Sequence, residues 1–332
     1  MPSLQAVRDS NSAYSPSYIP TIVVFGGTSG IGEAISKGFA RYTKGRAHLI
    51  IVGRNKAAAE ATIASLPKAS SDADPTAKGS QYEFVSCDVT VMKNIHQLAE
   101  DLKTRLEKIN YLILSAGVFG FGGREDTVDG LDTKLAARYY SRFAILQDFL
   151  PLLKAAKAKG EPASVLSVLG AGQTSAINFD DLGLNKKYSG IDAMVHSTTY
   201  NDLMVQVRAQ SYHLFLPGID QIASTSQGFA EREPDIAFTH IYPGFVDTGM
   251  LRPKGPIARV VMLLARPFIK AIATAPKDCA EYMIYAFLNA DKGMYRRGKT
   301  GDDIGLRSFP AATEEQKKAF WEHSVGAVKG KA

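Results

Sequence analysis

The sequence contains little cysteine and no long apolar run, and both shortages exclude classes of protein. Its two cysteines, Cys87 and Cys279, have neither the number nor the spacing of a disulfide framework or a zinc site. The longest apolar region, residues 257–274, is interrupted by arginine, proline and lysine, which is untypical of a membrane-spanning helix. The chain does not begin with a charged segment followed by an apolar one, so no signal peptide is predicted. We therefore expect a reduced, cytoplasmic protein with no metal site and no membrane span.

Charge of one sign is not concentrated in any segment either. The formal net charge is +6, but lysine and arginine are spread along the chain, and no run of five or six like charges occurs. We therefore predict no nucleic-acid partner. The 332 residues, of which 45% are hydrophobic, are enough for a large buried core. The sequence leaves open whether the chain forms a homo-oligomer.

Short apolar runs alternate with helical patterns over most of the chain. This alternation indicates an α/β fold with a doubly wound parallel sheet in a single domain, because such strands are covered by helices on both faces. The expected strands are residues 21–26, 47–53, 82–87, 110–116, 163–168 and 236–241. The expected helices are residues 30–42, 55–65, 91–107, 128–157 and 192–206.

Some segments lie outside this alternating pattern. Residues 1–19 are polar with scattered prolines and are expected to form a flexible N-terminal arm before a domain of residues 20–310. Residues 311–332 are expected to form a C-terminal helix and tail. Residues 207–227 interrupt an expected helix and have little amphipathic period, so we interpret them as a peripheral insertion. The alternative is that they are translated non-coding sequence.

The first expected strand is followed by a glycine-rich turn, Gly26-Gly27-Thr28-Ser29-Gly30-Ile31-Gly32, which opens the first expected helix. Glycines at such a turn let the backbone approach a pyrophosphate, and the helix contributes N–H groups and the positive end of its dipole. A glycine-rich turn alone is a weak signal, but its place between a strand and a helix strengthens it. The turn therefore predicts a dinucleotide site formed by Gly26, Thr28, Ser29, Gly30, Ile31 and Gly32.

The glycine spacing resembles that of the short-chain dehydrogenase/reductase superfamily, and further markers of this superfamily follow in order. Asp88 resembles the acidic residue that contacts the adenine, and Ala116-Gly117 resembles the end of an Asn-Asn-Ala-Gly segment whose asparagines are changed here. Pro243-Gly244 and Thr248 resemble the segment that holds the nicotinamide amide. The resemblance implies a Rossmann-type fold, and it covers nearly all of the chain except the arm, the insertion and the C-terminal end.

The end of the second expected strand distinguishes between the two nicotinamide cofactors. A carboxylate at this place would bind a ribose 2′-hydroxyl and repel a 2′-phosphate. This chain has Gly53, Arg54 and Asn55 instead, and a guanidinium suits a phosphate. We therefore predict NADP(H) as the cofactor, with Arg54 and Asn55 among the residues that bind it.

The residues with which this superfamily reduces carbonyls are replaced. Its members use a tyrosine as general acid, a lysine that lowers the tyrosine pKa, a serine that orients the substrate and an asparagine that holds a water. The resemblance aligns these with Met194, Thr198, Gly170 (or Leu169) and Arg138, respectively. Tyr295 to Lys299 also spells Tyr-x-x-x-Lys, but this segment follows the Pro-Gly segment in what we expect to be a basic turn, and we interpret it as a chance match.

These replacements favour some reactions over others. Loss of a general acid typically slows ketone reduction by ~10²–10⁴-fold. Hydride addition to a conjugated alkene instead gives an enolate, which needs an oxyanion partner more than a strong acid. Arg138 is the candidate partner because a guanidinium offers several donors and a permanent charge. The alternative, a structural arginine paired with a carboxylate on the helix surface, stays open.

Other polar side chains near these positions are weaker candidates. His196 is two residues from Met194 and therefore on another side of the helix, so we favour a structural role for it. Tyr139 and Tyr140 flank Arg138, and one of them is a candidate pocket residue.

Residues 250–275 are expected to form a substrate lid. The segment is apolar with scattered arginines, which predicts a bulky, hydrophobic small-molecule substrate. A helix resting on a membrane surface and a helix packed on the core are the alternatives. The function hypothesis is an NADPH-dependent oxidoreductase that reduces a conjugated C=C or an activated carbonyl in a polyketide-like compound, as the resemblance to fungal secondary-metabolite oxidoreductases implies. The alternative is the same fold used as a scaffold without redox chemistry, in a cyclase-like catalyst or a non-catalytic NADP-binding protein.

Overall fold

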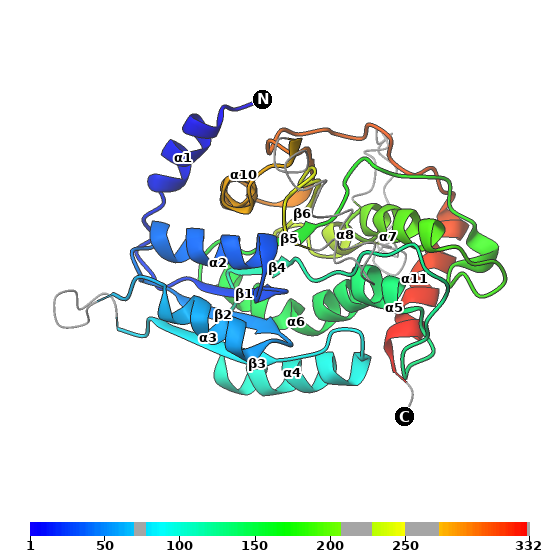
Figure 1. Ribbon diagram of the computed structural model, residues 1–332, viewed down its shortest axis with the longest axis horizontal. Coiled ribbons are helices and arrows are strands. Elements are labelled where there is room, and N and C mark those ends of the chain that lie inside the picture. Colours follow the sequence, from blue (N-terminus) through cyan, green and yellow to red (C-terminus); the bar gives the residue numbers. More distant parts are fainter. Residues whose placement is uncertain (70–77, 207–227, 250–271, 331–332) are drawn as a thin grey trace, which may run out of the picture.

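The computed structural model describes residues 1–69, 78–206, 228–249 and 272–330. A seven-stranded sheet runs through its centre in the order β3-β2-β1-β4-β5-β6-β7, and all neighbouring strands are parallel (Figure 1). The strands are β1 (Thr21–Phe25), β2 (His48–Gly53), β3 (Gln81–Ser86), β4 (Tyr111–Leu114), β5 (Ser164–Val168), β6 (Ala237–Ile241) and β7 (Gly293–Arg297). The strand order reverses between β1 and β4, and ligands of such sheets bind beyond the carboxyl ends of the strands at that point.

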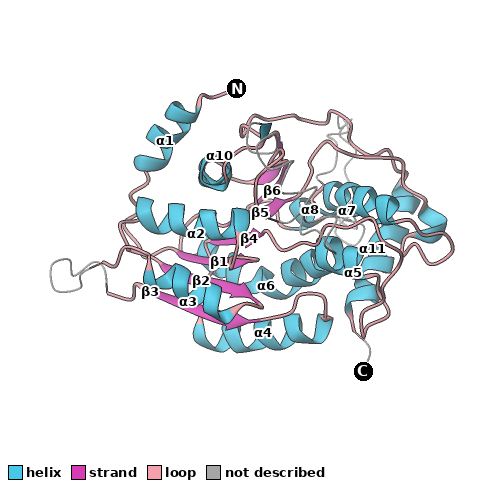
Figure 2. Cartoon of the chain, viewed as in Figure 1, coloured by secondary structure: helices cyan, strands magenta, loops and turns pink. Residues whose placement is uncertain are grey.

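Helices cover both faces of the sheet (Figure 2). One face carries α2 (Gly30–Tyr42), α3 (Lys56–Ala64) and α10 (Pro276–Leu288). The other face carries α4 (Met92–Arg105), α6 (Ser141–Ala158), α7 (Gly190–Met204), α8 (Phe229–Arg232) and α11 (Glu314–Val328). Alternate residues of β1 belong to the two hydrophobic clusters, Val23 to one and Val24 to the other. The expected doubly wound, single-domain α/β fold is therefore confirmed.

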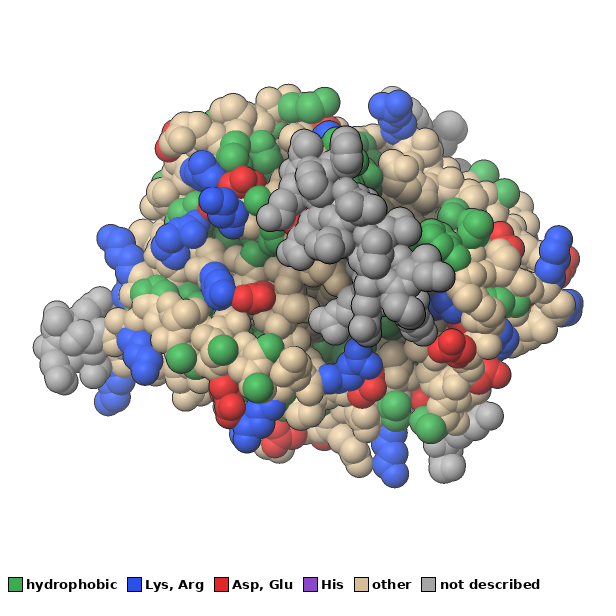
Figure 3. All heavy atoms as spheres, in the orientation of Figure 1, with side chains coloured by type: hydrophobic (Ala, Val, Ile, Leu, Met, Phe, Trp, Pro, Cys, Tyr) green, Lys and Arg blue, Asp and Glu red, His purple; other side chains and the backbone are tan. Residues whose placement is uncertain are grey.

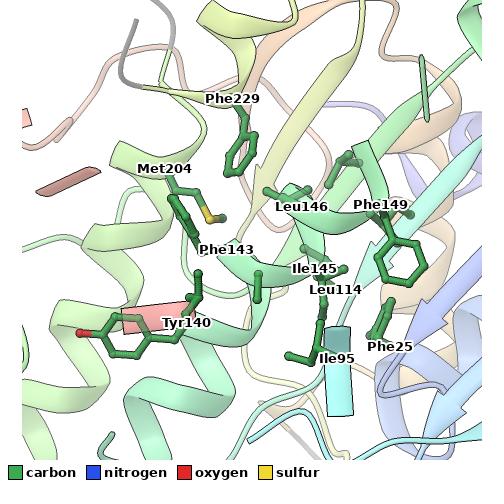
Figure 4. Close-up of a cluster of buried hydrophobic side chains, with 14 of the residues drawn as sticks. Phe25, Ile95, Leu114, Tyr140, Phe143, Ile145, Leu146, Phe149, Met204 and Phe229 are labelled. Carbon is green, nitrogen blue, oxygen red and sulfur yellow. The ribbon is translucent and has the colours of Figure 1, made fainter. Parts of the chain in front are cut away.

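Helix α6 supplies much of the larger hydrophobic cluster (Figure 4). The ring of Phe149 packs edge-on against Phe25 of β1, with ring centroids 5.6 Å apart. Six residues earlier, Phe143 packs against Phe229 of α8, with ring centroids 5.4 Å apart. These contacts fix α6 against the sheet, and with it the helical segment that precedes it.

All six expected strands are present, and each begins and ends within two residues of its expected bounds. The seventh strand, β7, was not predicted. Tyr295 lies within β7, and the expected basic turn begins only after Arg297, where the Gly301 N–H donates to the Gly298 carbonyl. The sequence of β7, Gly-Met-Tyr-Arg-Arg, is not typical of a buried strand. Its two arginines are nevertheless buried, because they bind partners elsewhere in the chain. Arg297, for example, donates hydrogen bonds to the carbonyls of Gly301 and Asn289.

The expected flexible arm is also corrected. Residues Leu4–Ser12 form α1, which packs on α10. Val7 is fully buried, Asn11 donates to the Glu281 carbonyl at 3.0 Å, and Arg8 pairs with Asp278 at 2.7 Å. The polar composition of this segment concealed the narrow buried stripe that fixes it.

The helix expected at 128–157 begins later and is not uniform. Asp132 accepts hydrogen bonds from the first backbone N–H groups and starts α5 (Thr133–Leu135). A π-helical turn, Ala136–Tyr140, then leads into α6. A short 3₁₀ turn, Phe179–Asp181, precedes α7. The expected insertion 207–227 and residues 250–271 of the expected lid lie outside the described residues.

The C-terminal helix α11 is tied to the body of the protein by His96 of α4. Nδ1 of His96 lies 2.6 Å from Asp148 Oδ2 of α6, and Nε2 lies 2.8 Å from the Val328 carbonyl of α11. Burial opposes the charged ring, but the two acceptors outweigh burial and raise the pKa of His96 above its usual value.

This raised pKa predicts a pH-dependent attachment of α11. The contact stabilises the folded state fully below about pH 6.5, the unfolded value, and its contribution is lost as the pH rises through the folded pKa. We expect hydrogen exchange of α11 amides, corrected for the intrinsic rate, to accelerate between pH 6 and pH 8.5, with β1 amides as the internal control. The variant His96→Gln should lose this dependence. An equal dependence in both proteins would contradict the assignment.

Candidate active site

The glycine-rich turn lies between the carboxyl end of β1 and the start of α2, and its glycines are sterically required. Gly26 has φ of 82°, and a Cβ on it would lie 2.5 Å from the Ala116 nitrogen. A Cβ on Gly32 would lie 2.4 Å from the Gly26 carbonyl oxygen, so only glycine lets α2 approach the turn. Gly30, with φ of 60°, faces Thr248 across a gap in which an added Cβ would meet the threonine Cβ at 3.1 Å. The fold therefore brings three predicted cofactor segments together.

The start of α2 fits a phosphate-bearing ligand. Ser29 is its N-cap residue, and the Ser29 side chain makes no capping hydrogen bond. The first N–H groups of the helix thus keep their capacity to bind an anion, next to a turn in which a side chain would collide with backbone. Thr28 packs against Gly53 at the end of β2, and Ile31 packs on the hydrophobic cluster beneath α2. These residues fit the pyrophosphate of a dinucleotide cofactor.

The ends of β2 and β3 bring Arg54 and Asp88 together. Arg54 Nη1 lies 3.6 Å from Asp88 Oδ2, and the Arg54 side chain is 69% exposed. Burial opposes the Asp88 charge, but hydrogen bonds from Thr90 and the nearby Arg54 outweigh it and lower the pKa of Asp88. Asn55 caps α3, because its Oδ1 accepts from the Ala58 N–H at 3.1 Å. Arg54 is thus a solvent-exposed cation at the end of the site that is predicted to hold the adenosine.

The segments predicted to hold the nicotinamide end follow β4 and β6. Ala116-Gly117 comes two residues after β4, and Pro243-Gly244 comes two residues after β6. Gly244 has φ of 76°, a conformation that favours glycine. The Thr248 N–H donates to the Val246 carbonyl at 2.9 Å, which closes a tight turn beside Gly30.

The three positions aligned with the family's serine, tyrosine and lysine also meet. A Cβ on Gly170 would lie 2.9 Å from Cγ2 of Thr198. The Thr198 hydroxyl donates to the Met194 carbonyl at 3.2 Å, so it is engaged within its own helix. Helix α7 contains no lysine. Under the predicted alignment, a thioether and a small hydroxyl replace the family's acid pair, and neither can act as a general acid at neutral pH.

Arg138 lies in the π-helical turn and reaches α7. Its Nε donates to the Ser197 hydroxyl at 2.9 Å, and its Nη2 and Nη1 donate weakly to the carbonyls of Met194 and Val118 at 3.4 and 3.5 Å. Its own carbonyl accepts from Asn201 Nδ2 at 2.9 Å, which supports the irregular turn. Burial lowers the pKa of Arg138 to about 10, so the side chain stays charged at neutral pH. Turns of this type are frequent at functional sites.

The two tyrosines next to Arg138 in the sequence lie in the core of the protein and do not line the site. Tyr139 and Tyr140 are fully buried, with their hydroxyls bonded to Ser324 and His323 of α11, so the expectation that one lines the pocket is wrong. The His196 ring packs against Tyr200 at 5.7 Å, and burial lowers the pKa of His196.

Sequence reasoning missed two groups of residues beneath this site. Arg142 of α6, one turn after Arg138, donates to the Ser167 hydroxyl and to the carbonyls of Ala116 and Val168. Its four-residue spacing from Arg138 was the available signal. The second group is a buried network of Asp202, His240 and Arg296, whose members are far apart in sequence. His240 Nε2 accepts the Gly170 N–H at 3.2 Å, while His240 Nδ1 lies 2.6 Å from Asp202.

The surface offers further constraints. A pocket of about 550 Å³ between α2 and α10 reaches Gly30 and Thr248. On the face drawn in Figure 3, basic and acidic side chains are interspersed. Within the described ranges, no cluster of histidine, cysteine, aspartate or glutamate is arranged to hold a metal ion. None of the described helices combines the length and apolar character needed to cross a bilayer.

The parallel sheet with a glycine turn at its switch point defines an α/β protein of the nucleotide-binding type. The chain belongs to the short-chain dehydrogenase family: the family model described as short chain dehydrogenase matches residues 20–178. The oxidoreductase AN1596 of Emericella nidulans is 30% identical over 87% of this chain and 78% of its own length. The oxidoreductase andH of Emericella variicolor is 32% identical over 87% of this chain and 76% of its own length. The expected resemblance to fungal oxidoreductases is thus confirmed.

Solved structures agree on the fold. An NADP active-site complex of RhlG from Pseudomonas aeruginosa has a TM-score of 0.54 at 18% identity, over 86% of this chain and 96% of that one. An alcohol dehydrogenase from Thermococcus sibiricus, complexed with 5-hydroxy-NADP, has a TM-score of 0.53 at 18% identity, over 84% and 95% of the two chains. The protein is therefore a member of an oxidoreductase family, with a fold that accommodates nicotinamide cofactors in its structural neighbours.

Proposed function

We propose that the protein is an NADPH-dependent reductase that acts on a conjugated C=C or an activated carbonyl of a bulky, hydrophobic small molecule. The observation that carries this proposal is the location of Arg138. Its charged guanidinium lies within hydrogen-bonding distance of the carbonyl of Met194, and Met194 is the residue aligned with the family's tyrosine. It can stabilise negative charge on a substrate oxygen without giving up a proton. An enolate needs this kind of help more than an alkoxide does.

The other residues of the site bind the cofactor and orient Arg138. The turn Gly26–Gly32 and the start of α2 hold the pyrophosphate, and Thr248 closes the nicotinamide end. When bound, NADPH supplies the hydride. Ser197 accepts the Arg138 Nε–H and so orients the guanidinium, which leaves its terminal nitrogens with only long hydrogen bonds of 3.4 and 3.5 Å. Those weakly held donors are the ones that a substrate oxygen can engage.

The reaction class is tested by following NADPH absorbance with a panel of enones and quinones, and with saturated ketones of the same skeleton. We expect oxidation of NADPH with the conjugated compounds and little with the saturated ketones, because a saturated alkoxide requires the missing acid. If NADPH binds but no compound oxidises it, while a chemical change of a substrate persists without cofactor, the fold serves as a non-redox scaffold and the proposal is wrong.

Cofactor preference is predicted separately. We expect the protein to bind NADPH about 10- to 100-fold more tightly than NADH, because a charge-assisted hydrogen bond from Arg54 to the 2′-phosphate is worth about 1.5–3 kcal/mol. The variant Arg54→Asp should reverse the preference. Fluorescence titration of both nucleotides measures it, with Lys56→Asp as a matched control, since Lys56 is equally exposed two residues away. Equal affinities in the unmodified protein, or an equal effect of the control variant, would contradict the role of Arg54.

A further inference from the structure

Two neighbouring arginines of the site, Arg138 and Arg142, are charged, and neither has an acidic partner among the described residues. In the ranges that the structure describes, every acceptor of their hydrogen bonds is neutral: a serine hydroxyl or a backbone carbonyl. Nε of Arg142, in a side chain that is 2% exposed, has no acceptor in the described part of the chain. Burial lowers the pKa of Arg142 to about 9, and the charge of Arg138 contributes to this shift. Both groups are nevertheless charged at neutral pH.

Two other buried cations, Arg296 and Lys134, do have carboxylate partners. Arg296, which is equally buried, has both oxygens of Asp202 within 3.0 Å. Lys134, one turn before Arg138, has Asp132 at 4.0 Å. No ion pair joins Arg138 or Arg142 to a described carboxylate, and two like charges side by side repel each other. Since an uncompensated buried charge is costly, an anion that enters the site would bind favourably.

The surroundings of the pair are apolar on the side of the β4–α5 loop. The Val118 carbonyl accepts from Arg138, and the next residue, Phe119, packs edge-on against Phe121 with ring centroids 4.9 Å apart. These rings are 41% and 64% exposed. The loop also touches the start of α7, where a Cβ on Gly190 would lie 2.6 Å from the Phe121 carbonyl carbon. An exposed aromatic pair thus begins one residue after Val118, an acceptor of the charged site.

We propose that the substrate is an apolar acid: an aromatic or polyene compound with a carboxylate or an equally acidic oxygen. Its oxyanion contacts Arg138, its apolar part contacts Phe119 and Phe121, and Arg142 acts as a positioning residue that adds a second charge from beneath. The inference rests on the proposed function for the location of the site, and it names the substrate class that the site selects. It is independent of whether a bound compound is reduced.

The test is a binding comparison between two compounds of nearly the same shape. Calorimetry with the NADP⁺-loaded protein at pH 7 measures the affinity for cinnamate and for its neutral amide, cinnamamide. We expect cinnamate to bind about 10- to 100-fold more tightly, as one or two charge-assisted hydrogen bonds predict. The ratio of the two affinities should fall towards one in Arg138→Gln and in Arg142→Gln, which remove a charge but keep a donor. Arg138→Lys and Arg142→Lys should retain most of it.

The design separates this proposal from its alternatives. Arg41→Gln, on the opposite face of the sheet, removes one positive charge at the surface and should leave the ratio unchanged. A ratio near one in the unmodified protein overturns the proposal, and so does an unchanged ratio in either glutamine variant of the pair. Because no turnover is measured, these results do not depend on NADPH oxidation: a protein that prefers the acid but never oxidises NADPH contradicts only the proposed reduction.

Discussion

Replacing Arg138 with methionine is expected to lower the turnover number for a conjugated ketone by about 10²–10³-fold, the usual effect of removing an oxyanion donor. Methionine keeps an unbranched, flexible stem but has no donor and no charge. NADPH affinity should change little, because Arg138 contacts α7 and the Val118 carbonyl and not the glycine turn. Stopped-flow kinetics under single-turnover conditions, with NADPH absorbance as the signal, measures the chemical step directly.

Two further variants make this result specific. Arg138→Lys retains the charge with a shorter reach and should recover part of the rate. Arg105→Met removes an arginine on α4 that pairs with Glu83 and Asp101, and it should leave the rate unchanged. A rate in Arg138→Met equal to that of the unmodified protein would exclude Arg138 as the oxyanion partner.

The largest loss of stability is expected from Asp202→Ala. Asp202 is fully buried, its two oxygens bind Arg296 at 3.0 and 2.7 Å, and it holds the His240 ring at 2.6 Å. Its removal leaves the buried guanidinium of Arg296 without a carboxylate partner, so the free energy of unfolding should fall by about 3–5 kcal/mol. Urea denaturation followed by circular dichroism measures the change. Glu322→Ala, in an exposed pair with Lys318 at 3.9 Å, serves as control and should cost less than about 0.5 kcal/mol.

The same network predicts a dependence on acid. Burial opposes the Asp202 charge, but His240 and Arg296 outweigh it and lower the pKa of Asp202 below its usual value. The contribution of Asp202 is therefore present above the unfolded pKa of about 3.9 and is lost as the pH falls through the folded value. A variant Asp202→Asn that matched the unmodified protein in stability at pH 7 would show that charge is not what holds Arg296.

The elements that the sequence predicts are those whose signals are local. The apolar runs of β1 and β2 and the glycine turn between β1 and α2 carry their information within a few residues, and they lie where the pattern places them. Strand β7 was missed because Arg296 depends on Asp202, 94 residues away. Helix α1 was missed for a similar reason, since Asn11 is buried only through Glu281 of α10.

The candidate site shows the same division. Spacing and the resemblance predict the motif residues and the alignment of Gly170, Met194 and Thr198, and these roles stay predictions. The burial of Tyr139 and Tyr140 under α11 could not be predicted, because it depends on residues almost at the end of the chain. Nor could the orientation of Arg138, because it depends on Ser197 and Asn201 in α7.

The π-helical turn at Ala136–Tyr140 lies within one continuous helical segment and changes the direction in which the side chains before and after it point. One residue more than an α-helical turn requires is accommodated there, which rotates everything after it by about 100° relative to an uninterrupted helix. Deleting one residue from this turn would therefore keep the helix but turn α5 against α6. Lys134, before the turn, would then lose its orientation toward the Gly123 carbonyl and the Tyr188 hydroxyl, while Phe143 and Phe149 kept theirs. The extra residue therefore lets the segment before the turn and the core face after it be oriented independently.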